Sequence, residues 1–213
     1  EGCANGVVTE LSTLGRRSAM VEADLAVEGA ADKVYRHAAD ALGGVDILIS
    51  NVAVERRQGT LEISGDDIEF HIAVNLRAQL QLIQRVLPAM EERRWGRILT
   101  TGSIQAARPN PRALIYAMLK AGQVNMVKNL ARQTAPMGIT VNSIAPGAIL
   151  TERSREAFED TAFRQMVEAR IPMGRIGTPE DCAGIALTLC SPAGAYITGA
   201  DIPIDGGWSI NDA

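Results

Sequence analysis

The sequence lacks the features that would place a protein in a membrane, on a nucleic acid or outside the cell. Its longest apolar runs, such as residues 45–50, are far too short to cross a bilayer. The formal net charge is −4, so no excess of basic residues favours binding to nucleic acid or to an anionic membrane surface. No signal-peptide pattern is present. We therefore expect a cytoplasmic protein.

Cysteine is scarce, and the cysteines are not spaced for a metal site or a disulfide framework. Cys3, Cys182 and Cys190 form no CxxC pair. This pattern indicates free thiols in a reducing compartment, and we expect no metal. The sequence also has no internal repeats, no low-complexity segment and no linker. We therefore expect one domain over residues 1–213, which is long enough for a well-filled core.

What the sequence does contain is an alternation of strand-like and helix-like stretches. The expected strands are residues 18–25, 45–50, 96–103, 138–146 and 200–207. The expected helices are residues 28–42, 66–94 and 113–134, with another beginning at Pro179. This order is typical of an α/β fold with a doubly wound parallel sheet, Rossmann-like, covered by helices on both faces.

Three of the expected strands end in polar or turn-forming residues. These ends are Ser50-Asn51, Thr101-Gly102-Ser103 and Pro146-Gly147. Because ligands bind at the carboxyl ends of strands in such sheets, we expect these residues to converge on one edge.

Tyr116 and Lys120 lie four residues apart in an expected helix, so they face one another one turn apart. Taken alone, the pair is more often a half-buried aromatic beside a solvated charge. Ser103 alone would most often cap the next element, and Asn75 alone would most often make a structural hydrogen bond between helix and sheet. Their combination changes that interpretation.

Together these four residues supply what hydride transfer to or from a carbonyl requires. A tyrosine hydroxyl can give the proton, but its ordinary pKa near 10 is high for work at neutral pH. We expect the ammonium of Lys120 to lower that pKa, Ser103 to bind the substrate oxygen, and Asn75 to hold a water that relays protons.

The chain resembles the short-chain dehydrogenase/reductase family, and 3-oxoacyl-ACP reductase-like members in particular. The resemblance covers nearly the whole sequence, in order: Asp24, "SNVA" (50–53), "VNL" with Asn75, "TGS" with Ser103, "YAMLK" with Tyr116 and Lys120, "PGAILT" (146–151) and "ITGADIPIDGGW" (197–208).

The resemblance implies an NAD(P)-dependent oxidoreductase that interconverts an alcohol and a ketone or aldehyde. The implied catalytic residues are Asn75, Ser103, Tyr116 and Lys120. The residues expected to bind NAD or NADP are Asp24, Leu25, Asn51, Val52, Ala53, Thr101, Tyr116, Lys120, Pro146, Gly147, Ile149 and Thr151. A homotetramer and a cover over the substrate at residues 152–172 are also implied. The apolar residues of this cover, Phe158, Phe163, Met166 and Ile171, hint at a non-ionic ligand.

Two departures from the family pattern matter. Ala53 stands where relatives have a glycine that lets the backbone approach the cofactor. The glycine-rich turn that binds the pyrophosphate is also missing from the sequence, together with the strands on either side of it. Because that unit also selects between NAD and NADP, the choice stays open. We expect the functional protein to carry an additional N-terminal segment with strand, glycine-rich turn, helix and strand.

Two other functions remain open. Relatives that eliminate halide from halohydrins share the scaffold and lack the usual glycine turn, but they carry arginine where Lys120 stands. A binding or scaffold protein without catalysis is the other alternative, and the presence of all four catalytic candidates weighs against it.

Overall fold

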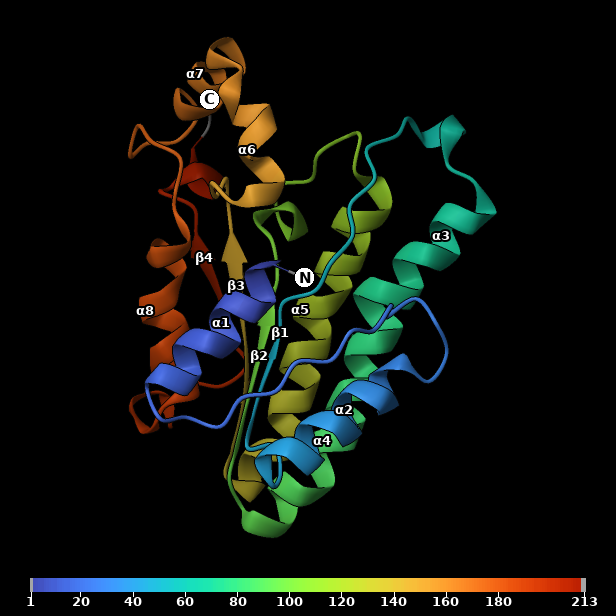
Figure 1. Cartoon of the computed structure of the whole chain (residues 1–213). Helices are drawn as coiled ribbons and strands as arrows, with labels where there is room; N and C mark the ends of the chain where they lie inside the picture. Colours follow the sequence, from blue (N-terminus) through green and yellow to red (C-terminus); the bar gives the residue numbers. More distant parts are fainter. Residues whose placement is uncertain (1, 212–213) are drawn as a thin grey trace.

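The computed structural model describes residues 2–211, arranged as a parallel sheet between helical layers (Figure 1). The strands are β1 (Ile47–Ser50), β2 (Gly96–Thr101), β3 (Ile139–Pro146) and β4 (Asp201–Ile204). The α-helices are α1 (Gly2–Thr13), α2 (Ala30–Leu42), α3 (Gly65–Ile72), α4 (Ala78–Arg93), α5 (Leu114–Thr134), α6 (Glu152–Glu159), α7 (Thr161–Glu168) and α8 (Pro179–Cys190).

The sheet has the order β1-β2-β3-β4, and every neighbouring pair is parallel. Side chains alternate between its two faces, so adjacent residues of β2 enter different cores. Ile98 packs with α4 and α5, whereas Leu99 packs with α8. The predicted α/β fold with a doubly wound parallel sheet is therefore confirmed.

Local sequence signals set many of the element ends. Gly43 closes α2 in the left-handed conformation, with a φ of 85° that glycine adopts without strain. Ser64 begins α3 by accepting a hydrogen bond from the backbone N–H of Asp67. The long helix expected over residues 66–94 runs as α3, a π-helical stretch at Ala73–Arg77, and α4, with Pro88 inside α4.

The strand expected at residues 18–25 is wrong. These residues have no regular strand structure, and β1 pairs with β2 alone within the described part of the chain. An extended segment becomes a strand only when a neighbour takes its backbone hydrogen bonds. Residues 18–25 have no such neighbour here, so their apolar pattern alone does not form a strand.

Within residues 2–211 we find no helix that is both long and apolar enough to cross a membrane. Cys182 and Cys190 carry free thiols, and the side chain of Cys3 lies outside the described part.

Candidate active site

The carboxyl ends of β1, β2 and β3 lie along one edge of the sheet, as their polar ends predict. Ser50 of β1 pairs with Thr100 of β2, and Thr101 pairs with Ile144 of β3. The helices α6 and α7 stand beyond this edge, next to the end of β3 (Figure 1). The parallel topology therefore brings together candidate residues that are far apart in the sequence.

Ser103 follows β2 and is buried, with 8% of its surface exposed. Its Oγ accepts a hydrogen bond of 3.2 Å from the backbone N–H of Gln105 and begins a short 3-10 helix, Ile104–Ala106. The capping role expected of an ordinary serine is thus present. The Ser103 side chain also acts on the Tyr116 hydroxyl, whose pKa it lowers against the effect of burial, so it serves the candidate site as well.

Tyr116 and Lys120 lie one turn apart on α5, and both are buried. The Lys120 Nζ lies 5.5 Å from the centroid of the Tyr116 ring. It donates to the backbone carbonyl of Thr101 at 2.6 Å and to Oε1 of Gln123 at 3.1 Å. An ammonium has three hydrogens, so one is left to donate to a bound molecule.

Burial controls the protonation of this pair. It raises the pKa of Tyr116, while the hydrogen bond from Ser103 opposes the shift. Burial also lowers the pKa of Lys120 to about 8, so this amine holds its charge less firmly than an exposed lysine does. The expectation that Lys120 pulls the pKa of Tyr116 down is therefore not met. A raised pKa keeps the phenol protonated at neutral pH, ready to donate.

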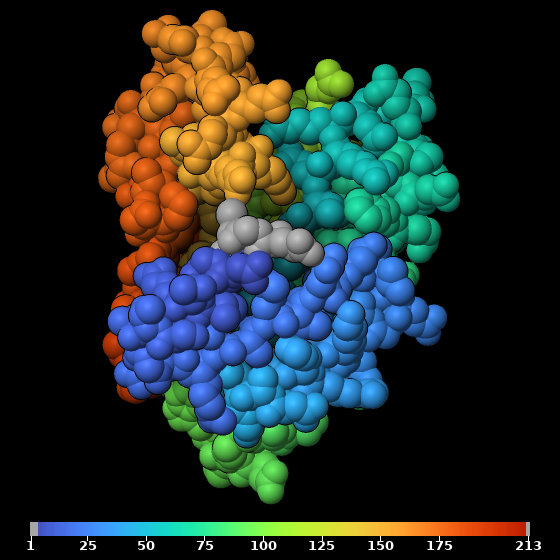
Figure 2. All heavy atoms as spheres, viewed as in Figure 1, coloured from blue at the N-terminus to red at the C-terminus, as the bar shows by residue number. Residues whose placement is uncertain are grey.

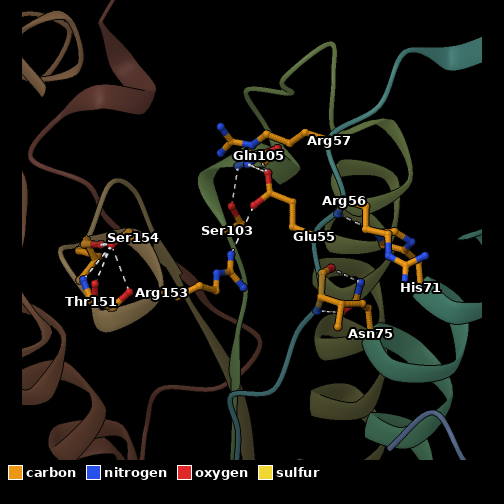
Figure 3. A network of polar contacts seen from close by, with 12 residues as sticks. Glu55, Arg56, Arg57, His71, Asn75, Ser103, Gln105, Thr151, Arg153 and Ser154 are labelled. Atoms are coloured by element: carbon orange, nitrogen blue, oxygen red, sulfur yellow. Dashed lines mark hydrogen bonds and ion pairs between the residues drawn. The ribbon is translucent and has the colours of Figure 1, made fainter. Parts of the chain in front are cut away.

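Asn75 lies in the π-helical stretch and is buried. Its Oδ1 accepts from the backbone N–H of Val54 at 2.8 Å, and its Nδ2 donates to the carbonyl of Val54 at 2.9 Å. The side chain therefore fixes the segment after β1 to the helix (Figure 3). Both ends of the amide are engaged, so a role of Asn75 in holding water remains a prediction.

Most of the candidate cofactor residues follow the ends of β1, β2 and β3, and they differ in exposure. Asn51, Val52 and Thr151 are exposed, and Ala53, Thr101, Pro146, Gly147 and Ile149 are partly buried. Asp24 is exposed and Leu25 partly buried in the turns before α2. Their role in binding a cofactor remains a prediction.

Gly147 is held close to its neighbours at the end of β3. A Cβ at this position would come within 2.8 Å of the Cβ of Asp205. The glycine therefore lets the chain turn toward α6 beside the last strand. Thr151 then begins α6, where its backbone N–H donates to Oγ of Ser154 at 2.8 Å.

In the segment expected to cover the substrate, residues 152–172, the apolar side chains pack together. Phe158 and Phe163 stack with ring centroids 5.7 Å apart, and they pack on a cluster that includes Ile171. Only Met166 among the four is largely exposed, at 44%. These side chains stabilise the segment, so they give no indication of a non-ionic ligand.

Three charged or polar residues beside Ser103 were not predicted. Glu55, Gln105 and Arg153 come together from the segment after β1, the 3-10 helix after β2 and helix α6 (Figure 3). The one signal in the sequence was the position of Glu55 and Gln105, each two residues after a predicted site residue. Arg153 had no comparable signal.

Comparison with known proteins places the chain in a family. Residues 3–209 match the family model described as "Enoyl-(Acyl carrier protein) reductase". The chain belongs to the short-chain dehydrogenase/reductase family. The 3-oxoacyl-[acyl-carrier-protein] reductase FabG of Aquifex aeolicus is 34% identical over 205 residues, covering 96% of this chain and 82% of the relative. The predicted family is thus confirmed.

Other members of the short-chain dehydrogenase/reductase family give the same result. L-rhamnose 1-dehydrogenase (NAD(P)(+)) of Sphingomonas sp. is 33% identical, covering 99% of this chain and 84% of that protein. A tropinone reductase homolog of Arabidopsis thaliana is 37% identical over 79% of this chain, which spans 55% of that protein. The crystal structure of a 3-oxoacyl (acyl-carrier-protein) reductase from Agrobacterium tumefaciens with NADP bound has a TM-score of 0.90 at 32% identity, covering 97% and 80% of the two chains.

Proposed function

We propose that the protein is an NAD(P)-dependent oxidoreductase that interconverts an alcohol and a ketone or aldehyde. The observation that carries this proposal is the buried group of Ser103, Tyr116 and Lys120 at the carboxyl edge of a parallel sheet. Relatives named as NAD(P)-dependent enzymes, and structures solved with NADP, support the same activity.

Each residue has a distinct role in this proposal. A nicotinamide cofactor, when bound, would supply or take the hydride. Tyr116 gives a proton to the carbonyl oxygen in reduction and takes it back in oxidation. Ser103 hydrogen-bonds the same oxygen, where negative charge grows as the reaction proceeds. Lys120 holds the cofactor ribose with its remaining hydrogen, and Asn75 keeps the segment after β1 in place.

The cofactor would lie along the row that begins at Asp24 and Leu25 and ends at Thr151. Asn51, Val52 and Ala53 would contact its middle part, beside Thr101. Pro146, Gly147 and Ile149 would lie at the nicotinamide end. We also propose that residues 152–172 cover the substrate and that the protein works in the cytoplasm.

We further propose that the protein is a homo-oligomer, a tetramer, which one measurement of mass in solution can test. The outer faces of α4 and α5 carry exposed apolar residues, namely Leu80, Leu114 and Met118. Closed symmetric assemblies are the usual outcome for soluble oligomers. Light scattering at micromolar concentration should give four times the mass of one chain, and a monomer mass would contradict the proposal.

The activity is tested first by binding. Full-length protein should bind NADH or NADPH, measured by the fluorescence of the nicotinamide, and should then oxidise that cofactor with a panel of ketones and aldehydes. Halide release from halohydrins without added cofactor would instead favour the dehalogenase-like alternative. Binding of neither cofactor, with no turnover of any carbonyl compound, would overturn the proposed function.

A further inference from the structure

The segment after β1 presents its side chains alternately to two sides. Arg56 and Gln58 turn toward α3, where both bind the carboxylate of Asp67, at 2.5 and 3.1 Å. Glu55, which precedes Arg56 in the chain, turns the other way, toward the residues after β2 (Figure 3). An extended backbone alternates in this manner. Because one side is tied to α3, the position of Glu55 is fixed.

Three donors converge on the buried carboxylate of Glu55, whose side chain is 9% exposed. Arg57 Nε reaches its Oε1 at 3.0 Å, and Gln105 Nε2 reaches the same oxygen at 3.4 Å. Arg153 Nη2 lies 3.5 Å from the other oxygen. A buried carboxylate needs such partners. Arg57 and Gln105 would still satisfy Glu55 if Arg153 turned away.

Arg153 is the least restrained member of this group. Its side chain is 67% exposed, and its ion pair with Glu55 is long. An exposed pair of this kind contributes at most about 1 kcal/mol. Arg153 extends from α6 toward the middle of the site, where Glu55 and Ser103 lie (Figure 3). A ligand of the right chemistry can therefore take the guanidinium from Glu55 at little cost.

The charge of Arg153 is felt at the reacting residues. It opposes the effect of burial on the pKa of Tyr116, which burial raises, and it adds to the effect of burial on the pKa of Lys120, which burial lowers. The group as a whole has two guanidinium ions and one carboxylate. Lys120 adds a positive charge and Asp201, whose carboxylate raises the pKa of Lys120, adds a negative one, so one positive charge is in excess, which favours an anion over a neutral molecule.

The residues of this group come from two segments, the one after β1 and helix α6, which lie on opposite sides of the site. In Figure 2, residues 51–72, in teal, and α6, in yellow and orange, flank the middle of the face. Arg153 is the residue through which α6 reaches across to the segment after β1.

We propose that Arg153 binds a carboxylate group of the substrate, so that the protein acts on keto or hydroxy acids rather than on neutral carbonyl compounds. This inference rests on the proposed function and names its substrate class. A guanidinium binds a carboxylate through two parallel hydrogen bonds, which a neutral ester or amide cannot reproduce. Glu55 is the partner of Arg153 at rest, and the substrate carboxylate replaces it.

The test compares each keto acid with its own methyl ester. A series with two to five carbons between the carbonyl and carboxyl carbons is assayed with the cofactor that binds, and kcat/KM is measured for acid and ester. Full-length protein should prefer the acid. Arg153→Gln should reduce the acid-to-ester ratio about tenfold or more, since hydrogen bonds to charged groups are worth about 1.5–3 kcal/mol. The ester rate should fall much less than the acid rate, and the Kd for the cofactor should stay nearly the same.

The matched control is Arg164→Gln, which removes an exposed arginine from α7 that pairs with Glu168. It should leave the acid-to-ester ratio unchanged. Because both arginines are largely exposed, neither variant should unfold the protein. Arg153→Lys keeps the charge without the paired donors, and it should recover only part of the ratio.

Two outcomes would overturn the inference. One is an acid-to-ester ratio that is the same in the parent protein and in Arg153→Gln. The other is a loss of cofactor affinity in Arg153→Gln that accounts for the whole effect, which would assign Arg153 to a cofactor phosphate. An enzyme that reduces esters as well as acids would defeat this inference alone, whereas absence of all cofactor binding and turnover would defeat the proposed function.

Discussion

The neighbouring strands β1 and β2 differ in how far their side chains, and the residues that follow them, are exposed to solvent. Leu99 of β2 and Ile49 of β1 are register partners, yet Leu99 is 1% exposed and Ile49 is 55% exposed. Beyond β2 lie the buried residues Ser103 and Tyr116, whereas beyond β1 lies the exposed Val52. Proton chemistry needs the buried side, because burial is what shifts the pKa values. A long cofactor needs the open side, where backbone and side chains can be reached.

The largest effect is expected on the buried side, from Tyr116→Phe. Loss of the proton donor should reduce kcat by about 10²–10⁴-fold. The Kd for the cofactor should stay nearly the same, because the hydroxyl contributes little to binding the dinucleotide. The control is Tyr196→Phe, since Tyr196 is fully exposed. A Tyr116→Phe enzyme that keeps its kcat would remove Tyr116 from the proposed role.

The comparison of the strands can be tested directly through stability. Leu99→Ala should lower the free energy of unfolding by about 2–5 kcal/mol, because it leaves a cavity in the core against α8. Ile49→Ala should cost less than about 1 kcal/mol, because more than half of the side chain is already in contact with water. Urea unfolding of the two variants measures both values. Equal losses would mean that another part of the protein, or a second chain, covers β1.

Lys120→Met should reveal the cost of burying an amine. The pKa of Lys120 falls from 10.5 to about 8 in the folded protein, which corresponds to about 3 kcal/mol. Between these pH values the unfolded chain binds a proton that the folded chain does not, so the stability of the parent protein rises with pH. Below about pH 8 Lys120 is charged in both the folded and the unfolded state, so the full cost of burying the ammonium is present.

The variant lacks this titration. The parent protein should therefore gain stability relative to Lys120→Met as the pH rises from 7.5 to 10, by about 2 kcal/mol. Urea unfolding at both pH values gives the difference. Loss of the hydrogen bonds to Thr101 and Gln123 shifts both values equally and does not affect this comparison. A difference that is independent of pH would show that Lys120 titrates normally.

Much of the fold could be predicted because its signals are local or periodic. Gly43 ends α2, and the apolar repeats of the long helices identify their buried faces. The spacing of Tyr116 and Lys120 places them on one side of α5 whatever the tertiary structure. The strand expected at residues 18–25 failed for the opposite reason. Strand formation depends on a neighbour, and a local pattern says nothing about whether one is present.

The finer features of the site depend on tertiary structure. Arg153 and Glu55 are 98 residues apart, and no spacing rule connects them. The shift in the pKa of Tyr116 depends on whether burial or nearby charge is the stronger influence, and only the packed structure decides this. Likewise, Asn75 could be placed on a helix from the sequence, but its hydrogen bonds to Val54 depend on how the segment after β1 returns over that helix.

The smallest effect on stability is expected on the exposed side, at Asp24. Its carboxylate accepts one hydrogen bond, from the backbone N–H of Ala26 at 2.9 Å, in a turn that is open to water. Asp24→Ala should therefore change the free energy of unfolding by only about 0.5 kcal/mol.

If Asp24 holds the adenine ring, the loss of one hydrogen bond of about 1 kcal/mol should raise the Kd for the cofactor about fivefold. Glu28→Ala, an exposed acidic residue in the same region, is the control for the loss of charge. A Kd that rises equally in both variants would indicate general electrostatics, and an unchanged Kd in Asp24→Ala would place the adenine elsewhere. A selective rise would show that the exposed segment before α2 binds the cofactor while contributing almost nothing to stability.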